Sequence, residues 1–348
     1  MGKRSWLAGL FMVVASMGCE PQPVPPTPVP PKPTAREQAQ VPSVIDPVAE
    51  LRDKPLYEFS PREVDVYLKH LHATEPNLRS RIVHLARKNI DQPYELYLLG
   101  EAPFEMVDAQ PIYCLDKSDC VVFAEHTLAM AMSDSWPSFM TMLQRIRYKD
   151  GQIGVVTRNH YTEADWNRNN TWLARDITDE IGGESVVRFT QKVDRAKFLK
   201  GRYKLDELIE IETIEESFIP YERIESVASR LRDGDIVNFV TGREGGYWVG
   251  HVGLVARGAD GGLNLIHSAA PKVREEPAAA YIARMTKDAA EKDAAKKARF
   301  QGFKFLRLSE DPLASLRTVD GDAGPRVTTP AGSATTWEQY LQSFDLGG

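Results

Sequence analysis

The apolar positions between residues 60 and 99 follow the period of an amphipathic helix. In SPREVDVYLKHLHA, Ser60 is a typical N-cap, and Pro61 fits the first helical turn. The apolar positions at three- and four-residue spacing are Val64, Tyr67, Leu68 and Leu71. The segment LRSRIVHLARKNI repeats the pattern. We therefore predict two helices before residue 100.

A further helix is predicted from Cys120 to Met132. Val121, Leu128 and Met132 fall on one face of it, and Asp119 is placed to cap its first turn. Glu125 lies inside this helix, where we expect it to be a structural partner for an arginine rather than a catalytic acid.

The later part of the chain changes from helical to strand periodicity. DGDIVNFV, HVGLVA, LNLIHSA and FKFLRL are short β-branched and aromatic runs separated by Gly- and Asp-rich turns, which predict an antiparallel sheet. Helices followed by strands favour an α+β fold over a doubly wound one. The Ala- and Lys-rich residues 278–299 are predicted to form one solvated helix before the last strand.

The N-terminal residues resemble an export signal followed by a spacer. MGKRSWLAGLFMVVASMGC has a basic start, a short apolar stretch and small residues before Cys19. Cys19 after Gly18 also resembles a lipobox cysteine, although general signal cleavage is the alternative. The proline-rich residues after Cys19 favour an extended polyproline conformation. We predict a lipid anchor on Cys19 and a location in the cell envelope, on the periplasmic side.

These features divide the chain into four parts. Residues 1–19 are predicted to be the signal peptide, 20–42 the proline-rich linker, 43–310 the folded domain with its N-terminal helices, and 311–348 a loosely ordered tail.

Composition narrows the function further. The chain has 348 residues, ordinary apolar content and a formal charge of -6, so it can bury a core but offers no basic field for nucleic acid. We expect no nucleic-acid partner.

Cys120 could be a small hydrophobe in a core, half of a disulfide, a metal ligand or a reactive nucleophile. In an exported protein it could pair with Cys114, six residues earlier. A zinc site is a second possibility, but the region has no Cys-x-x-Cys or His-x-x-x-His spacing. As a nucleophile at a helix start, Cys120 would have free backbone N–H groups beside it and a thiol pKa lowered by the helix dipole. The residues alone leave the disulfide and the nucleophile open.

A nucleophile needs a base, and His251 and His267 are the candidates. His251 begins one predicted strand and His267 ends the next. A tight hairpin through RGADGG would bring the two histidines side by side.

Five segments in this order, DCVVFAE, TRNHY, DGDIVNFVT, HVGLV and LIHSA, resemble the N-acetylmuramoyl-L-alanine amidase-like family of the NlpC-type papain-like peptidoglycan hydrolases. The resemblance covers roughly residues 92–308. It implies a papain-like α+β domain in which a helix-borne cysteine packs on an antiparallel sheet. It further implies an amidase that cleaves between N-acetylmuramic acid and L-Ala of peptidoglycan or muropeptides, without metal or other cofactor.

The resemblance also assigns roles. Cys120 matches the nucleophile, His251 the general base and His267 the residue that orients the base, while Tyr94 in QPY is a further donor near the oxyanion. Two positions depart from the family pattern: Cys114 lies close to the nucleophile, and Val122 stands where a hydroxyl residue is usual.

Substrate binding is predicted in TRNHYTEADWNRNNTW and GYWVGH. Arg158 can grip a carboxylate, Asn159 and His160 add polar groups, and aromatic faces suit a sugar ring or methyl groups. These faces belong to Tyr161, Trp166 and Trp248. Two alternatives remain: a cysteine endopeptidase of stem peptides, and a non-catalytic lipoprotein that binds muropeptides.

Overall fold

The computed structural model describes residues 46–243, 245–322 and 324–347. The predicted signal peptide, Cys19 and the proline-rich linker lie outside the described residues. Within the described part, no helix is both long and apolar enough to cross a bilayer.

The two predicted N-terminal helices are confirmed as α1 (Pro61–Thr74) and α2 (Leu78–Lys88). Ser60 caps α1 by accepting a hydrogen bond from the backbone of Glu63, whose carboxylate accepts one from the backbone of Ser60 in return. The four apolar positions predicted for α1 are all buried. Side-chain spacing alone therefore identifies the face of α1 that enters the core.

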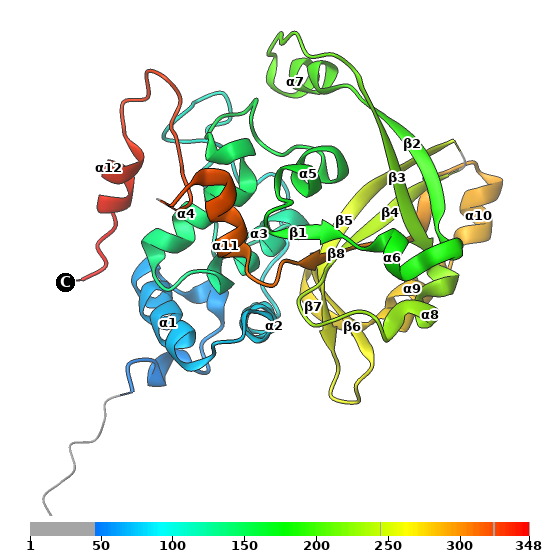
Figure 1. Cartoon of the computed structure of the whole chain (residues 1–348), viewed down its shortest axis with the longest axis horizontal. Helices are drawn as coiled ribbons and strands as arrows, with labels where there is room; N and C mark the ends of the chain where they lie inside the picture. Colours follow the sequence, from blue (N-terminus) through cyan, green and yellow to red (C-terminus); the bar gives the residue numbers. More distant parts are fainter. Residues whose placement is uncertain (1–45, 244, 323, 348) are drawn as a thin grey trace, which may run out of the picture. The chain divides into compact units, whose positions relative to one another are not determined.

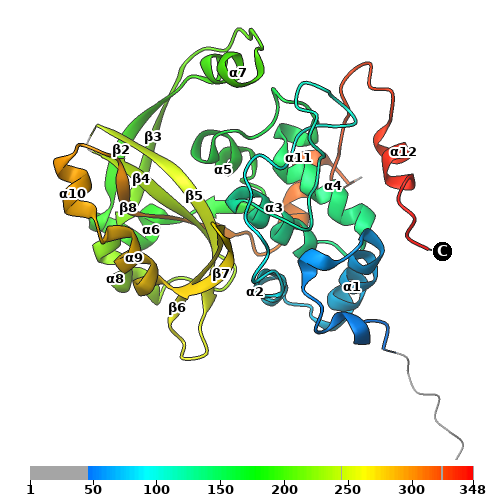
Figure 2. The same ribbon diagram turned by 180° about the vertical axis from the view of Figure 1, so that it is seen from behind.

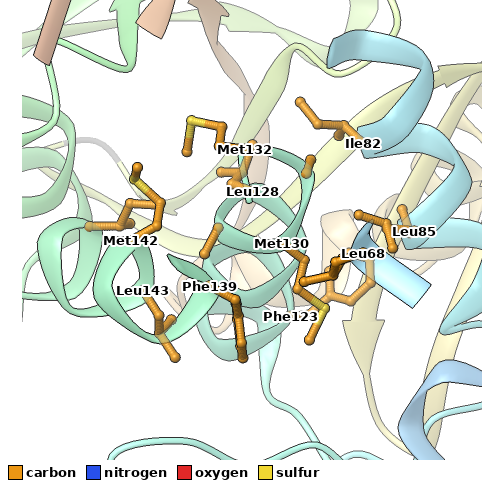
Figure 3. Packing of buried hydrophobic residues seen from close by; sticks show 14 of the residues in the cluster. Leu68, Ile82, Leu85, Phe123, Leu128, Met130, Met132, Phe139, Met142 and Leu143 are labelled. Atoms are coloured by element: carbon orange, nitrogen blue, oxygen red, sulfur yellow. The ribbon is translucent and has the colours of Figure 1, made fainter. Parts of the chain in front are cut away.

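Helix α3 (Cys120–Ala131) lies at the centre of the helical part. Every residue from Val122 to Ala131 is buried, so the helix is covered on all sides. α2 and α4 (Trp136–Arg147) pack against it, and so do strands β5 (Gly246–Arg257) and β6 (Leu263–Ala269). Figure 3 shows the apolar side chains of α3 meeting those of α1, α2 and α4.

The predicted antiparallel sheet is confirmed, and the fold is α+β. It has eight strands in the order β2-β3-β8-β4-β5-β6-β7, with β1 paired to β8 (Figure 1). The remaining strands are β1 (Ala174–Asp176), β2 (Val187–Val193), β3 (Glu212–Pro220), β4 (Ile236–Arg243), β7 (Lys272–Pro277) and β8 (Arg299–Leu308). Figure 2 shows α3 next to β5, the strand that carries His251.

Short helices lie before and between the strands. They are α5 (Asn167–Asn169), α6 (Thr178–Gly182), α7 (Arg195–Tyr203), α8 (Ile224–Ala228), α9 (Ala278–Thr286) and α10 (Ala289–Ala294). The prediction of one helix over 278–299 is wrong, because α9 and α10 are separate. α7 joins β2 to β3 and lies at the far end of that hairpin (Figures 1 and 2).

The C-terminal segment, predicted as a loosely ordered tail, contains two helices. It forms α11 (Pro312–Asp320) and α12 (Trp337–Gln342). Leu316 and Trp337 are buried in the same core as α3, and the Asp320 carboxylate pairs with the buried Arg145 guanidinium. A few apolar anchors separated by polar residues hold this segment, so the sequence shows no clear helical period there.

Candidate active site

Cys120 is the first residue of α3. The Asp119 carboxylate accepts hydrogen bonds from the backbone N–H groups of Val121, at 3.0 Å, and Val122, at 2.9 Å, and so fixes the start of the helix. The predicted cap is therefore confirmed. Cys120 is half-buried, and the backbone N–H of Val252, the residue after His251 in β5, contacts its sulfur.

The prediction of a lowered thiol pKa is wrong. Burial, followed by the neighbouring Asp119 carboxylate, raises the pKa of Cys120 to about 12. The backbone N–H groups of Val252, Val121 and Cys120 itself oppose this rise, as expected at a helix start, but the loss of hydration outweighs them. Cys120 is therefore a neutral thiol near pH 7.

The predicted hairpin is confirmed: β5 and β6 pair antiparallel and bring His251 and His267 together. The Nε2 atom of His251 lies 2.8 Å from the Nδ1 atom of His267. Gly253 makes this approach possible, because a Cβ atom there would lie 3.0 Å from the Cβ of His267 and 2.9 Å from the carbonyl oxygen of Ile266. The glycine of HVG therefore leaves the space that the two histidines need to come together.

Glu276 on β7 extends the pair and was missed by the sequence analysis. Its Oε1 atom lies 2.9 Å from the Nε2 atom of His267, and it also accepts hydrogen bonds from Arg274 and Arg284. Although burial opposes the shift, these three partners lower the pKa of Glu276 to about 2. Glu276 is therefore a carboxylate at neutral pH.

The carboxylate determines the tautomers of both histidines. Because Glu276 can only accept, the Nε2–H of His267 donates to it, which leaves the Nδ1 of His267 as an acceptor. The Nε2–H of His251 donates to that atom, so the Nδ1 of His251 is free to take up a proton. Burial and then His267 lower the pKa of His251 well below its usual value, so its ring is neutral near pH 7.

Aromatic rings hold the two imidazoles in place. Phe239 on β4 lies 4.8 Å from His251 and 5.8 Å from His267 between ring centroids. Tyr281 on α9 packs edge-on against His267 at 5.5 Å. These contacts also remove the rings from water, which is the first cause of their lowered pKa values.

Tyr94 lies close to the cysteine. It bridges to the backbone of Ser118, two residues before Cys120, and the thiol contributes to raising the pKa of Tyr94, after burial. A buried hydrogen-bond chain supports this arrangement: the Ser118 hydroxyl donates to Gln92 at 2.7 Å, and the Ser268 hydroxyl donates to the Ser118 carbonyl at 2.9 Å. The segments that carry Tyr94, Cys120 and His267 are thereby tied together.

A cavity of about 670 Å³ opens between the segment around residue 160, β2 and the start of β5. His160, Tyr161 and Trp248 line it, and Trp248 is 41% exposed. The structure thus brings three of the predicted substrate-binding residues to one cavity.

Residues 84–287 match the model of the AmiA-like family, described as N-acetylmuramoyl-L-alanine amidase-like. This stretch is more than half of the chain and includes the cysteine, both histidines and Glu276. The protein belongs to the N-acetylmuramoyl-L-alanine amidase-like family.

Solved structures share the fold. A protein from Legionella pneumophila superposes with a TM-score of 0.61 at 19% identity, over 71% of this chain and 94% of the other. An N-acetylmuramoyl-L-alanine amidase from Bacteroides uniformis superposes with a TM-score of 0.52 at 24% identity, over 67% of this chain and 99% of the other. No curated protein matches the sequence.

Arg158 of this amidase-like protein already has partners within the chain. Its guanidinium donates to both carboxylate oxygens of Glu101 and, at 3.1 Å, to Asp108. It also donates to the hydroxyl of Tyr203 at 3.2 Å. A substrate carboxylate would have to displace these groups to reach Arg158.

Asn159 and His160 are also hydrogen-bonded within the fold. The side-chain amide of Asn159 donates to the carbonyl of Ile146 at 2.9 Å. The Nε2 atom of His160 lies 2.7 Å from the carbonyl of Val155, and burial followed by Arg158 lowers the pKa of His160 to about 3. His160 therefore meets the cavity as a neutral ring.

Cys114 and Cys120 are both free thiols in this structure, so the disulfide that the residues left open is not formed. Among the described residues, no group of His, Cys, Asp and Glu side chains could hold a metal ion. Glu125 pairs with Arg147 at 3.3 Å and accepts from Trp166 at 3.1 Å, which confirms the predicted structural role.

Proposed function

We propose that this protein hydrolyses the amide between the lactyl group of N-acetylmuramic acid and L-Ala, in peptidoglycan or muropeptides, by a cysteine–histidine mechanism. The observation that carries the proposal is the hydrogen-bonded chain His251–His267–Glu276 on the sheet that packs against the start of α3, where the backbone N–H of Val252, next to His251, contacts the Cys120 sulfur. Family membership supplies the amidase class.

In the first step, the free Nδ1 of His251 takes the thiol proton as the sulfur of Cys120 attacks the amide carbon. The carbonyl oxygen becomes an oxyanion, which the backbone N–H of Cys120 and the hydroxyl of Tyr94 would stabilise. The protonated His251 then gives its proton to the departing nitrogen of L-Ala. The C–N bond breaks, and a thioester to the muramoyl lactyl group remains.

The second step returns the enzyme to its starting state. His251 takes a proton from water, and the resulting hydroxide attacks the thioester carbon. The C–S bond breaks, the muramoyl carboxylic acid leaves, and the proton on His251 returns to the sulfur of Cys120. No oxidant, metal or cofactor is needed to balance the reaction.

His267 and Glu276 act on the base rather than on the substrate. The raised pKa of the Cys120 thiol and the lowered pKa of His251 favour proton transfer during the attack over transfer before it. The charge that develops on His251 is then stabilised through His267 by Glu276, in the way that a carboxylate supports the histidine of a serine triad. His267 and Glu276 are thus positioning residues.

The cavity beside Trp248 is proposed to receive the sugar. An exposed indole offers a flat apolar face, and Tyr161 and His160 lie in the same cavity. The helix-borne cysteine against an antiparallel sheet that carries the histidines also supports the NlpC-type papain-like placement.

Digestion of defined muropeptides with mass analysis of the products tests the proposal. An amidase releases intact stem peptides that begin with L-Ala, together with the free muramoyl sugar. Fragments cut within the stem would favour the endopeptidase, and binding without any product would favour a non-catalytic muropeptide-binding protein.

We also propose that Cys19 carries lipid and holds the domain at a membrane of the cell envelope. The short apolar stretch before Cys19 and the proline-rich spacer after it support this location. Fractionation of a Cys19→Ala variant tests it: the variant should leave the membrane fraction, and an unchanged distribution would contradict the anchor.

A further inference from the structure

A small cavity of about 40 Å³ lies beside the proposed nucleophile. Val121, the residue after Cys120, forms part of its wall, and so does Val252, whose N–H contacts the Cys120 sulfur. Ala124, Trp166 and Ile236 complete its apolar lining. A group bound at Cys120 would therefore have an apolar recess next to it.

Helix geometry relates this recess to the sulfur. Side chains four residues apart lie on the same face of a helix, so Ala124 is one turn below Cys120. Ala124 is 3% exposed, and any larger side chain there would project into the cavity. The size of residue 124 thus limits the space available next to the reacting atom.

The cavity also contains a polar group without a partner. Asn238 on β4 lines it and is fully buried, and its Oδ1 atom accepts a hydrogen bond from Asn167 at 2.9 Å. Among the described residues, nothing accepts a hydrogen bond from its Nδ2 atom. A buried amide donor is costly to leave unsatisfied, and a substrate carbonyl next to the scissile bond could accept from it.

The small and the large cavity share His160 and Thr162 in their linings. Thr162 begins the π-helix Thr162–Trp166, a conformation that is often found at functional sites. The two cavities therefore adjoin at His160 and Thr162, so a substrate in the 670 Å³ cavity would lie next to the recess.

We propose that this recess is a specificity pocket for a methyl group on the carbon next to the scissile amide, with the Asn238 amide donating to a neighbouring substrate carbonyl. The inference rests on the proposed amidase function and names the ligand class as alanyl amides. A water-sized group needs roughly 10–15 Å³ of such volume, so the recess of about 40 Å³ has room for a methyl group. The L-alanyl and the D-lactyl group both carry such a methyl.

Selectivity ratios test the pocket. We compare kcat/KM on two pairs of substrates. The first pair is muramoyl-L-alanine and muramoyl-glycine, which differ in the methyl group of the amino acid. The second pair is muramoyl-L-alanine and its analogue with a glycolyl group in place of the lactyl group, which differ in the methyl group on the sugar side. Ala124→Val should lower the preference for the methyl-bearing member of one pair by about 10-fold or more, since one methylene in an apolar pocket is worth roughly 10- to 200-fold. The pair that responds identifies which methyl occupies the recess.

The ratio of the two kcat/KM values within a substrate pair does not depend on the fraction of enzyme that is folded. Ala129→Val provides the matched control. Ala129 is a buried α3 residue outside the cavity lining, so this variant should keep the wild-type ratios. If Ala124→Val hydrolyses the substrates with both kcat/KM ratios unchanged, the methyl pocket is contradicted and the amidase function is not. Failure of the wild type to hydrolyse any of these substrates would overturn the amidase function, and the inference with it.

Asn238→Asp tests the donor separately. Aspartate keeps the oxygen that accepts from Asn167 but removes the NH₂ group, so kcat/KM on each of these substrates should fall by about 10-fold with the methyl ratios preserved. Thermal unfolding would verify that the variant is folded. If the folded variant keeps the wild-type kcat/KM, Asn238 does not donate a hydrogen bond to the substrate.

Discussion

The Nε2 atom of His251 lies 2.8 Å from the Nδ1 atom of His267, across the hairpin of β5 and β6. Glu276 accepts a hydrogen bond from the Nε2 atom of His267. Together these two contacts leave the Nδ1 atom of His251 as the nitrogen that can take up a proton. In the proposed mechanism His251, whose Nδ1 is free to accept a proton, is the base, and His267 orients it.

The two histidines should therefore differ in their importance. We predict that His251→Ala lowers kcat by more than about 100-fold, the lower range for a lost general base, and that His267→Ala retains measurable turnover. Single-turnover and steady-state rates on a muropeptide measure both. If His267→Ala were inactive while His251→Ala kept its activity, the roles of base and orienting residue would be the reverse of those assigned.

Glu276 should control the pH dependence. Its negative charge raises the pKa of His251 and His267, so Glu276→Gln should lower the pKa of the base further. Protonation of the base then needs a more acidic solution, and the acid limb of the kcat/KM profile should move to lower pH while the plateau falls.

Glu275→Gln is the matched control for that profile. Glu275 is the neighbouring residue, but its carboxylate pairs with Arg87 and Asn264 and not with a histidine. Its profile should follow the wild type. An acid limb that moves to higher pH in Glu276→Gln would contradict the electrostatic coupling.

Much of this site can be predicted from the sequence, because it depends on local signals. Asp119 before Cys120 is a capping signal, and RGADGG between two strands sets the hairpin that pairs the histidines. Glu276 could not be found in this way, since KVREEP has the charge of a solvated edge and its position depends on pairing between β6 and β7. The raised thiol pKa was missed for a similar reason: it arises from burial by distant segments, which a helix-start argument ignores.

Arg158 should contribute mainly to stability. It is 10% exposed and pairs with Glu101 and Asp108, so Arg158→Ala would leave a buried carboxylate unpaired. We predict a loss of about 3–5 kcal/mol in the free energy of unfolding, measured by denaturant titration. Arg188→Ala, which breaks an exposed pair with Asp179, should cost at most about 1 kcal/mol; equal losses in the two variants would contradict the structural role.

Trp248 should matter for substrates that carry a sugar. We predict that Trp248→Ala lowers kcat/KM on a disaccharide muropeptide by about 10-fold, from the loss of aromatic packing, with a smaller effect on a sugar-free lactyl-peptide. Tyr97→Ala removes another exposed aromatic side chain, which lies outside the cavity, and should change neither rate. A Trp248→Ala effect of equal size on both substrates would exclude a sugar contact.

The most direct test of the central claim compares the two free thiols on one substrate. Cys120→Ala and Cys114→Ala are each incubated with a defined muropeptide, and the released stem peptide is quantified by mass spectrometry, with thermal unfolding as the check of folding. We predict that folded Cys120→Ala releases no stem peptide, because the nucleophile is gone, while Cys114→Ala remains active. Release of the stem peptide by Cys120→Ala at the wild-type rate would contradict the cysteine mechanism.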